Sequence, residues 1–315
     1  MAVGSRPLVP SRLAPGGVAH GSRRTPTTVI GAYVALTKPR IIELLLITTV
    51  PTMVLAEQGW PAWSLVIVTL IGGTLSAGSA NACNMYVDRD IDALMQRTQT
   101  RPLVTGVIAP RNALIFAGVL QVLAFAVLWA GANLLSAVLA FGAAAFYIGV
   151  YTLWLKRTSR QNIVIGGAAG AVPVLVGWAA VTNSLSWTPI VLFLAMFLWT
   201  PPHFWALAVK YADDYRAADV PMLPTVVPLE DAVRQMIWYT IALVVTTLVL
   251  IPVAGLGWIY AVTAAVLGAM FIGGVFALKR HPTPAASMRL FGFSITYVTV
   301  LFGAMTLDVL VEYGW

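Results

Sequence analysis

Long apolar stretches are the feature that most constrains the fold of this chain. Nine of them reach the length that a helix needs to cross the hydrocarbon core of a bilayer, about 20 residues. Because the sequence is 59% hydrophobic and 10% charged, a water-soluble globule could not bury so much apolar surface. We therefore predict an all-α, polytopic membrane protein, a bundle of nine transmembrane helices built as one domain from residues 31–315. The predicted spans are 40–57, 62–86, 112–131, 135–155, 161–181, 187–209, 235–255, 257–278 and 289–310.

The distribution of lysine and arginine supports this count. Nine spans place the N-terminus and the loops after spans two, four, six and eight on one side of the membrane. All 19 basic residues fall on that side, which the positive-inside rule assigns to the cytoplasm. We expect a multi-pass protein of a bacterial cytoplasmic membrane with its C-terminus outside. The net charge of +7 is then a topology signal that also attracts anionic lipid, and no nucleic-acid partner is expected.

The remaining general features limit the chemistry. Residues 1–30 are rich in Pro, Gly, Ser and Arg and are expected to form a disordered basic cytoplasmic tail, although a mitochondrial transit sequence stays open. Cys83 is the only cysteine, which excludes disulfide frameworks and multi-cysteine metal sites. Asp308 and Glu312, near the opposite face, are expected to be solvated.

The end of the second predicted span carries an unusual group of polar residues. Asn84, Asp88 and Asp92 are spaced i, i+4 and i+8, so a continuing helix would present them on one side, with Asp90 pointing elsewhere. Carboxylates are disfavoured at the C-terminal end of a helix, so a cation must offset them. Few, hard oxygen ligands open to water suit Mg²⁺ shared with a phosphate-bearing substrate. The alternative is a hydrated loop that neutralises itself by pairing the acids with Arg89, Arg97 or Arg101.

A second acidic segment follows the sixth span, on the same side of the membrane. It contains Asp213, Asp214 and Asp219, with Lys210 and Arg216 between or beside them. Two acidic clusters facing each other across a cavity could hold two Mg²⁺ ions around a diphosphate, with basic residues taking the remaining charge. Such an arrangement would ease ionisation of the carbon–oxygen bond of a prenyl diphosphate.

Several sequence blocks, read together, resemble a known family. The pair of acidic motifs is similar to that of the intramembrane aromatic prenyltransferase superfamily, whose fold has nine helices. Further blocks resemble the branch of that superfamily that farnesylates protohaem IX. They are "TKPRIIELLLITT" (37–49), "NACNMYVDRDIDALMQRTQTRPL" (81–103), "YTLWLKRTSRQNIVIGGAAGAVPVLVGWAAVT" (151–182), "TPPHFWALAVKYADDY" (200–215) and "VPMLPTV" (220–226).

The resemblance implies transfer of farnesyl from farnesyl diphosphate to a vinyl group of haem b, giving haem O for terminal oxidases. It implies Mg²⁺ as cofactor, with Asn84, Asp88 and Asp92 as the first metal–diphosphate motif. Asp214 would lead the second motif with Asp213 in support, and Asp88, Asp92 and Asp214 would be the catalytic carboxylates. Asp219 departs from the pattern, because that branch usually has glycine there.

The same resemblance suggests substrate-binding residues and partners. Arg101, Lys156 and Lys210 converge on the face where a diphosphate and two haem propionates need cations; the alternative for each is a topology anchor at the lipid headgroups. The ring of Tyr151 could stabilise an allylic cation, although core packing is the alternative for it. His203 is the only histidine within a predicted span and could contact haem or ligate its iron, or be a structural residue. Besides membrane lipid, the implied partners are the downstream haem A synthase or the terminal oxidase assembly.

Two other functions stay open at this point. A sister membrane prenyltransferase acting on a quinone or chlorin precursor would keep both acidic motifs, but not the block from Thr200 to Tyr215. A cation-coupled transporter could also place acids at helix ends near a cavity. It would usually show inverted repeats, and none is visible in the sequence.

Overall fold

The computed structural model describes residues 28–314, apart from the side chains of residues 41 and 43–46, and within that range it contains helices joined by turns and loops, without strands. The predicted disorder of the N-terminal tail concerns residues that, up to residue 27, lie outside this range. The helices are α1 (Val29–Thr37), α2 (Pro39–Glu57), α3 (Trp63–Val87), α4 (Arg89–Leu94), α5 (Pro110–Gly131), α6 (Leu134–Phe146), the π-helix η1 (Tyr147–Leu155), α7 (Lys156–Thr158), α8 (Asn162–Thr182), α9 (Trp187–Lys210), α10 (Ala212–Ala217), α11 (Leu223–Val226), α12 (Leu229–Ala254), α13 (Trp258–Arg280) and α14 (Pro284–Tyr313).

Every predicted span is helical. Among the described residues, eight helical segments are long and apolar enough to cross a membrane, one of them formed by α6, η1 and α7 in succession. The first predicted span corresponds to the 19 residues of α2, of which the continuously described part, Ile47–Glu57, is an apolar helix. The polytopic all-α fold is therefore confirmed, with eight helical segments of membrane-spanning length and composition among the described residues.

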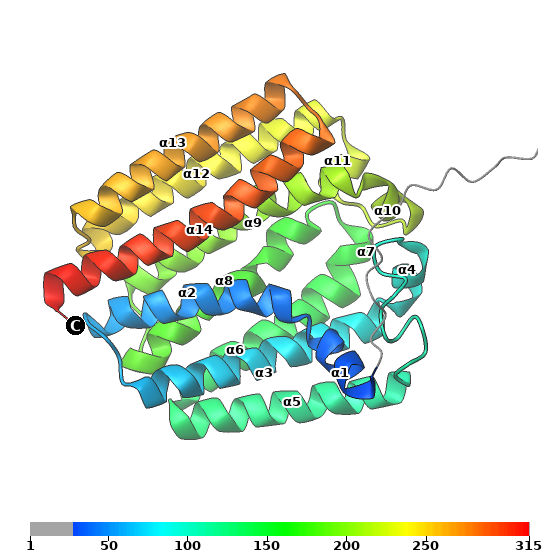
Figure 1. The fold of residues 1–315 in the computed structure, drawn as a ribbon, viewed down its shortest axis with the longest axis horizontal. Helices are drawn as coiled ribbons and strands as arrows, with labels where there is room; N and C mark the ends of the chain where they lie inside the picture. Colours follow the sequence, from blue (N-terminus) through cyan, green and yellow to red (C-terminus); the bar gives the residue numbers. More distant parts are fainter. Residues whose placement is uncertain (1–27, 315) are drawn as a thin grey trace, which may run out of the picture.

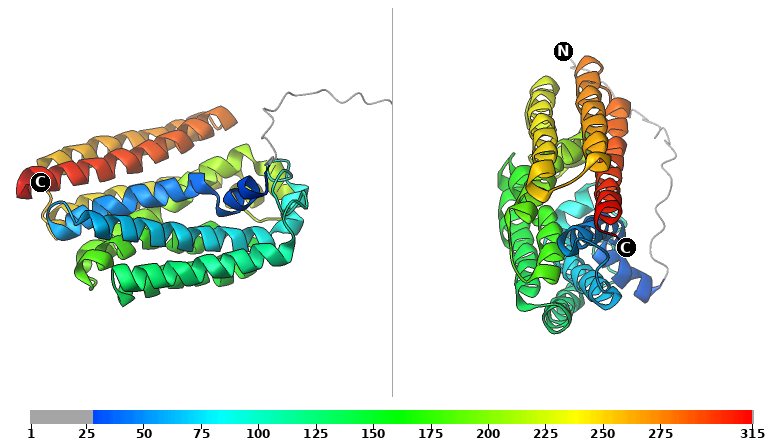
Figure 2. Two further views of the ribbon diagram at one scale, coloured as in Figure 1. Left: turned by 60° about the horizontal axis from the view of Figure 1, so that its bottom comes forward. Right: turned by 90° about the vertical axis from the view of Figure 1, so that its left-hand side faces the viewer.

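The long helices run side by side and gather their charged connections at one end of the bundle (Figure 1). We call this the charged end; it contains α4, α7, α10 and α11, and the C-terminus lies at the opposite end. The largest apolar core joins α8, α9, α12, α13 and α14, and includes the buried Trp205, Tyr260 and Phe271. α3 and α5 pack along each other on the far side of the bundle (Figure 2). The short helices at the charged end are thus attached to long helices that pack against one another.

Two details differ from what the sequence predicts. α1 is an additional short helix, which packs on α3 and ends where Lys38 adopts a left-handed conformation with φ 53°. Asp308 is not solvated: it is 4% exposed, and its carboxylate accepts hydrogen bonds from the backbone N–H groups of Gly257 (2.5 Å) and Tyr260 (3.2 Å). These groups start α13, so Asp308 caps that helix from α14. Glu312 is exposed, as predicted.

Candidate active site at the charged end

The first acidic motif lies where α3 gives way to α4. α3 ends at Val87 and α4 begins at Arg89, with Asp88 between them at φ −84° and ψ 1°. The near-helical backbone keeps Asn84, Asp88 and Asp92 together: their exposures are 2%, 0% and 2%. Asp90 points elsewhere, as predicted from the spacing.

Each member of the motif is held by a different cation. Lys38 Nζ donates to Asn84 Oδ1 at 2.7 Å, Lys156 Nζ donates to Asp88 Oδ2, and Arg101 Nη1 donates to Asp92 Oδ2 at 2.5 Å. These cations come from three separate parts of the chain: the α1–α2 junction, the start of α7 and the α4–α5 loop. The cluster therefore has three oxygen ligands facing three positive charges.

Lys38 is a site residue that the sequence does not reveal. Its removal from water, together with the nearby charges of Arg101 and Lys156, lowers the pKa of Lys38 well below its usual value. A lysine followed by Pro39 and held at positive φ is unusual, because the left-handed region costs a side chain about 1 kcal/mol. That backbone conformation turns the chain from α1 into α2 and brings the ammonium to Asn84.

The residues of this motif fit a Mg²⁺ ion. Asp88 Oδ1 is buried and has no hydrogen-bond partner; Arg157 Nη2 lies 4.0 Å from it. Burying a carboxylate oxygen without a partner costs free energy. Such an oxygen is a preferred ligand of hard divalent cations. Within the described part of the chain, no three His, Cys, Asp or Glu side chains already form a metal cluster. The fit thus rests on Asn84, Asp88 and Asp92 as oxygen donors.

The π-helix η1 explains how Lys156 reaches Asp88. Thr152 Oγ1 donates to the carbonyl of Tyr147, five residues earlier, at 2.9 Å, and accepts from Asn84 Nδ2 at 3.0 Å. The wider turn rotates the residues that follow relative to α6. One threonine therefore ties the geometry of η1 to the acidic motif and directs Lys156 at it.

Asp90 takes part in a separate, outer ion pair. Arg157 donates through Nη1 and Nη2 to the two oxygens of Asp90, at 2.7 and 2.6 Å. This hydrogen bonding lowers the pKa of Asp90 to about 2. The Asp90 side chain is 61% exposed, so the pair braces α4 against α7 from outside the cluster.

The second acidic segment is arranged differently. Asp214 accepts hydrogen bonds from the backbone N–H groups of Gln96 (3.1 Å) and Arg97 (3.2 Å), which follow the first motif. Asp213 has a fully exposed side chain and pairs with Arg216 at 3.0 Å. Of the two predicted ligands in this segment, the structure brings Asp214 to the site and leaves Asp213 pointing away from it.

Asp219 and Lys210 lie at the edges of this segment. Asp219 is exposed, and its φ of 49° is the left-handed conformation that glycine adopts at least cost. Lys210 ends α9 and is exposed, with its Nζ 5.4 Å from the centre of the Tyr211 ring.

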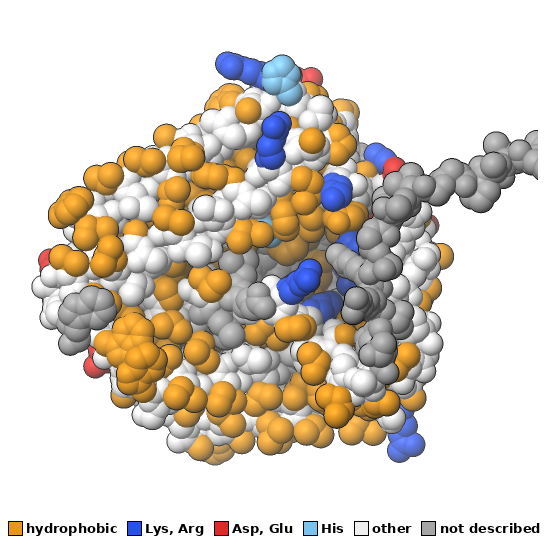
Figure 3. Space-filling view, viewed as in Figure 1, with side chains coloured by type: hydrophobic (Ala, Val, Ile, Leu, Met, Phe, Trp, Pro, Cys, Tyr) orange, Lys and Arg blue, Asp and Glu red, His pale blue; other side chains and the backbone are white. Residues whose placement is uncertain are grey.

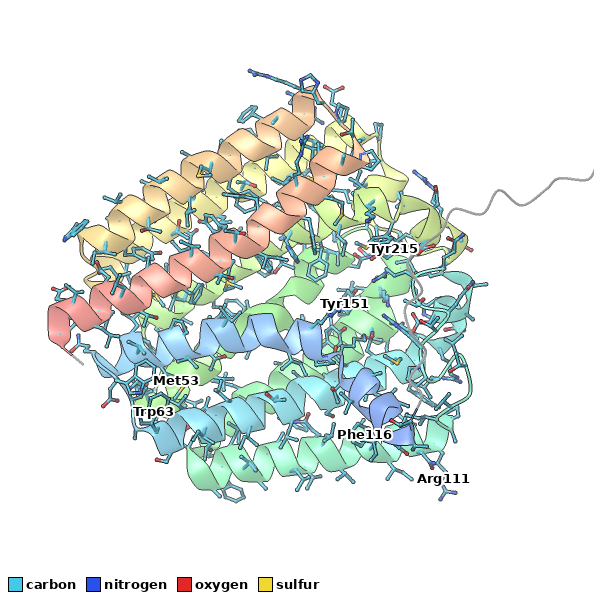
Figure 4. All side chains as sticks on the ribbon, in the orientation of Figure 1. Met53, Trp63, Arg111, Phe116, Tyr151 and Tyr215 are labelled. Carbon is cyan, nitrogen blue, oxygen red and sulfur yellow. The ribbon has the colours of Figure 1, made fainter. Side chains whose placement is uncertain are left out.

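Two stacked tyrosines border the acidic motif. The rings of Tyr147 and Tyr151 lie 5.2 Å apart with 24° between their planes. Gly166 of α8 lets the Tyr151 ring approach, because a β-carbon at that position would collide with it. Figure 4 shows Tyr151 with Tyr215 at the charged end, far from Met53 and Trp63. Tyr151 thus faces the site and also packs in a cluster with Tyr215.

His203 lies deeper in α9 and is 5% exposed. Its ring stacks between Trp199, at 4.1 Å, and Phe291, at 4.5 Å. His203 Nδ1 is 2.7 Å from Ser294 Oγ, whose single hydroxyl proton is directed to the carbonyl of Phe291 at 2.7 Å. Ser294 must therefore accept from Nδ1–H, which leaves Nε2 as the unprotonated nitrogen.

One side of the bundle has a recess, which we call the hollow. Figure 3 shows the face between α14 and the start of α2 drawn inward at its centre, with hydrophobic side chains around it and lysine or arginine on the side of the charged end. The hollow opens on the flank of the helices, where lipid would surround a membrane protein. An amphiphile could thus place its charged group at the charged end and its apolar part among the helices.

Comparison with known proteins identifies the family. The model of the UbiA prenyltransferase family matches residues 45–299. The chain belongs to the UbiA prenyltransferase family. It is 49% identical over 307 residues to protoheme IX farnesyltransferase of Pseudarthrobacter chlorophenolicus, covering 96% of this chain and 94% of the relative. It is also 49% identical over 315 residues to protoheme IX farnesyltransferase of Streptomyces coelicolor, covering 98% of each.

Solved structures of family members share the fold. A digeranylgeranylglyceryl phosphate synthase superposes with a TM-score of 0.75 at 16% identity, covering 90% of this chain and 99% of the other. A UbiA homologue of Archaeoglobus fulgidus bound to DMAPP and Mg²⁺ gives a TM-score of 0.63 at 18% identity, covering 89% and 99%. Membership of a prenyltransferase family removes the basis for the transporter alternative.

Proposed function

We propose that this chain is a Mg²⁺-dependent protoheme IX farnesyltransferase, which makes haem O from farnesyl diphosphate and haem b. Relatives of that name at 49% identity over nearly the whole chain support the activity. The observation that carries the site assignment is the buried motif of Asn84, Asp88 and Asp92, whose oxygens meet three cations while Asp88 Oδ1 has no partner.

Asn84, Asp88 and Asp92 would hold the metal, and Asp214 would support it by fixing the loop that follows the motif. A Mg²⁺ ion bound there would neutralise the diphosphate as it leaves. Lys38, Lys156 and Arg101 are placed to exchange their contacts with the motif for contacts with diphosphate oxygens. They would stabilise the leaving group more as its negative charge grows.

The remaining residues orient the two organic groups. Loss of diphosphate breaks the bond between farnesyl C1 and oxygen, and the Tyr151 ring faces the cation that develops there. The vinyl carbon of haem b bonds to C1, and water then adds to the cation beside the porphyrin and gives up a proton. His203 would contact the porphyrin through Nε2. No protein nucleophile is required.

The distribution of basic residues also gives the orientation of the protein in the membrane. We place the charged end in the cytoplasm and the C-terminus outside a bacterial cytoplasmic membrane, because all lysines and arginines fall on one side. Contacts with haem A synthase or a terminal oxidase remain expectations from the resemblance.

The test is direct. Protein purified in detergent is incubated with haem b, farnesyl diphosphate and Mg²⁺, with EDTA in a parallel sample, and haem is analysed by mass spectrometry. We expect haem O only in the sample with metal. Consumption of farnesyl diphosphate with a quinone or chlorin precursor, and none with haem b, would instead assign the chain to a sister branch.

A further inference from the structure

Some of the cations at the charged end form ion pairs with carboxylates, and others do not. Among the described residues, Arg157 and Arg216 are paired with aspartates, as are Lys156 and Arg101. Four cations near the site have no carboxylate partner in that part of the chain. Lys38 is engaged by Asn84 and Arg89 by the carbonyl and ring of Tyr86, which leaves Arg97 and Lys210. Both form cation–π contacts with the same aromatic ring. The guanidinium carbon of Arg97 lies 5.3 Å, and Lys210 Nζ 5.4 Å, from the centre of the Tyr211 ring.

Arg97 is held in place by several contacts, yet one of its hydrogen-bond donors has no acceptor. Asp214 binds its backbone N–H, and a second ring, Tyr215, lies 5.7 Å from its guanidinium, with a weak contact of 3.5 Å from Nη2 to the Tyr215 hydroxyl. Its Nε is buried without any hydrogen-bond partner. A half-buried guanidinium beside two aromatic rings, with one donor that lacks a partner, is a binding group for a planar carboxylate.

An aromatic surface runs from Arg97 towards His203. Phe204, Tyr211 and Tyr151 pack on the same apolar cluster as Tyr215, and Phe204 meets His203 edge to face at 5.0 Å. On α9, His203 and Lys210 are seven positions apart, so they share a face about 10 Å from each other along the helix. This surface is apolar along its length and cationic at its outer end.

We propose that Arg97 and Lys210 bind the two propionate carboxylates of the porphyrin acceptor. The inference rests on the proposed function and assigns the acceptor's position within it. The diphosphate already has Lys38, Lys156 and Arg101 at the metal motif, which leaves this second, separate pair of cations for a second anionic substrate. Because the propionates share one edge of the macrocycle and the vinyl groups another, fixing the carboxylates decides which edge meets the prenyl donor.

Binding of haem b, followed by its Soret absorbance, tests the assignment without requiring turnover. The full-length protein in detergent is titrated with haem b and with its dimethyl ester, which lacks the charges. We expect the unmodified protein to bind haem b about 10- to 100-fold more tightly than the ester. Arg97→Gln should lose that preference by weakening haem b binding alone, and Lys210→Gln should reduce it less, because Lys210 is exposed.

Controls separate this role from others. Arg216→Gln changes an arginine of the same end that is already paired with Asp213, and should leave both affinities unchanged; Arg97→Lys should restore part of the preference. Equal weakening of haem b and ester binding by Arg97→Gln would indicate a structural role and overturn the proposal, as would a raised KM for farnesyl diphosphate with haem affinity intact. Failure of the unmodified protein to bind haem b would overturn the proposed function as well.

Discussion

Asp88 and Asp213 both follow a long apolar helix at the charged end, yet their surroundings have little in common. The Asp88 side chain is 0% exposed and meets Lys156, whereas the Asp213 side chain is 101% exposed and meets only its near neighbour Arg216. A carboxylate in low dielectric holds its charge only through strong partners, while an exposed one is stabilised by water. The difference separates a reactive cluster from an accessory segment within one end of the molecule.

Replacing Asp88 should have the largest effect. Asp88→Asn keeps the shape of the side chain but removes the charge and the second oxygen needed for a metal. We expect the rate of haem O formation to fall by about 1,000-fold while the protein remains folded, as measured by mass spectrometry and thermal unfolding. Retention of most activity would remove Asp88 from the metal site.

Removing the ammonium opposite Asp88 tests the buried character of the cluster. Lys156→Met leaves a buried carboxylate uncompensated, which should lower the free energy of unfolding by about 3 kcal/mol without metal. Mg²⁺ should then raise the Tm more in the variant than in the unmodified protein, because it no longer competes with Lys156. Arg216→Gln, which changes a cation paired only with the exposed Asp213, is the control, and an equal Mg²⁺ response in both variants would contradict the prediction.

The accessory segment is tested by a neighbouring pair of variants. Asp214→Ala removes the acceptor for the N–H groups of Gln96 and Arg97, which should cost about 1 kcal/mol of local stability and reduce turnover by about 10-fold. Asp213→Ala removes only an exposed pair and should leave kcat and the Mg²⁺ dependence unchanged. If Asp213→Ala shifts the Mg²⁺ dependence, both aspartates bind metal and the distinction between the two carboxylates fails.

The smallest effect is expected at Asp90. Its pKa is lowered from 3.8 to about 2 by Arg157, so the stabilisation is present above pH 3.8 and is lost as the pH falls through 2. Because the pair is exposed, Asp90→Asn should lower the Tm only slightly at pH 7. The difference in Tm between the two proteins should shrink as the pH falls from 3.8 and vanish below pH 2; a difference that grows on acidification would reverse the assigned sign.

The sequence predicts the long helices well and the polar details less well. Apolar stretches of bilayer length identify every long helix, including α8 and α9, which continue through Pro173 and through Pro201 with Pro202. The four-residue spacing predicts the convergence of Asn84, Asp88 and Asp92, because local helical geometry brings them together. Such periodic signals depend only on neighbours along the chain.

Long-range polar partners could not be predicted in this way. No sequence pattern around Lys38 predicts its contact with Asn84, 46 positions later. None around Asp308 predicts that it caps α13. The π-turn at Thr152 depends on a partner in α3, and a pattern of hydrophobic residues cannot distinguish it from an ordinary helical turn. The sequence indicates Arg97 only as a counter-ion for the first motif, because its two tyrosine rings belong to α10 and the residue before it.

The hollow on the side of the bundle bears on how substrate concentration is expressed: per volume of solution, or relative to the surrounding lipid or detergent. A substrate that reaches the site sideways, between α14 and α2 (Figure 3), arrives by two-dimensional diffusion, and its effective concentration is its mole fraction in the surrounding lipid or detergent. Adding empty micelles at constant total substrate should therefore slow the reaction by surface dilution. Rates plotted against mole fraction should fall on one curve, whereas rates plotted against molarity should not.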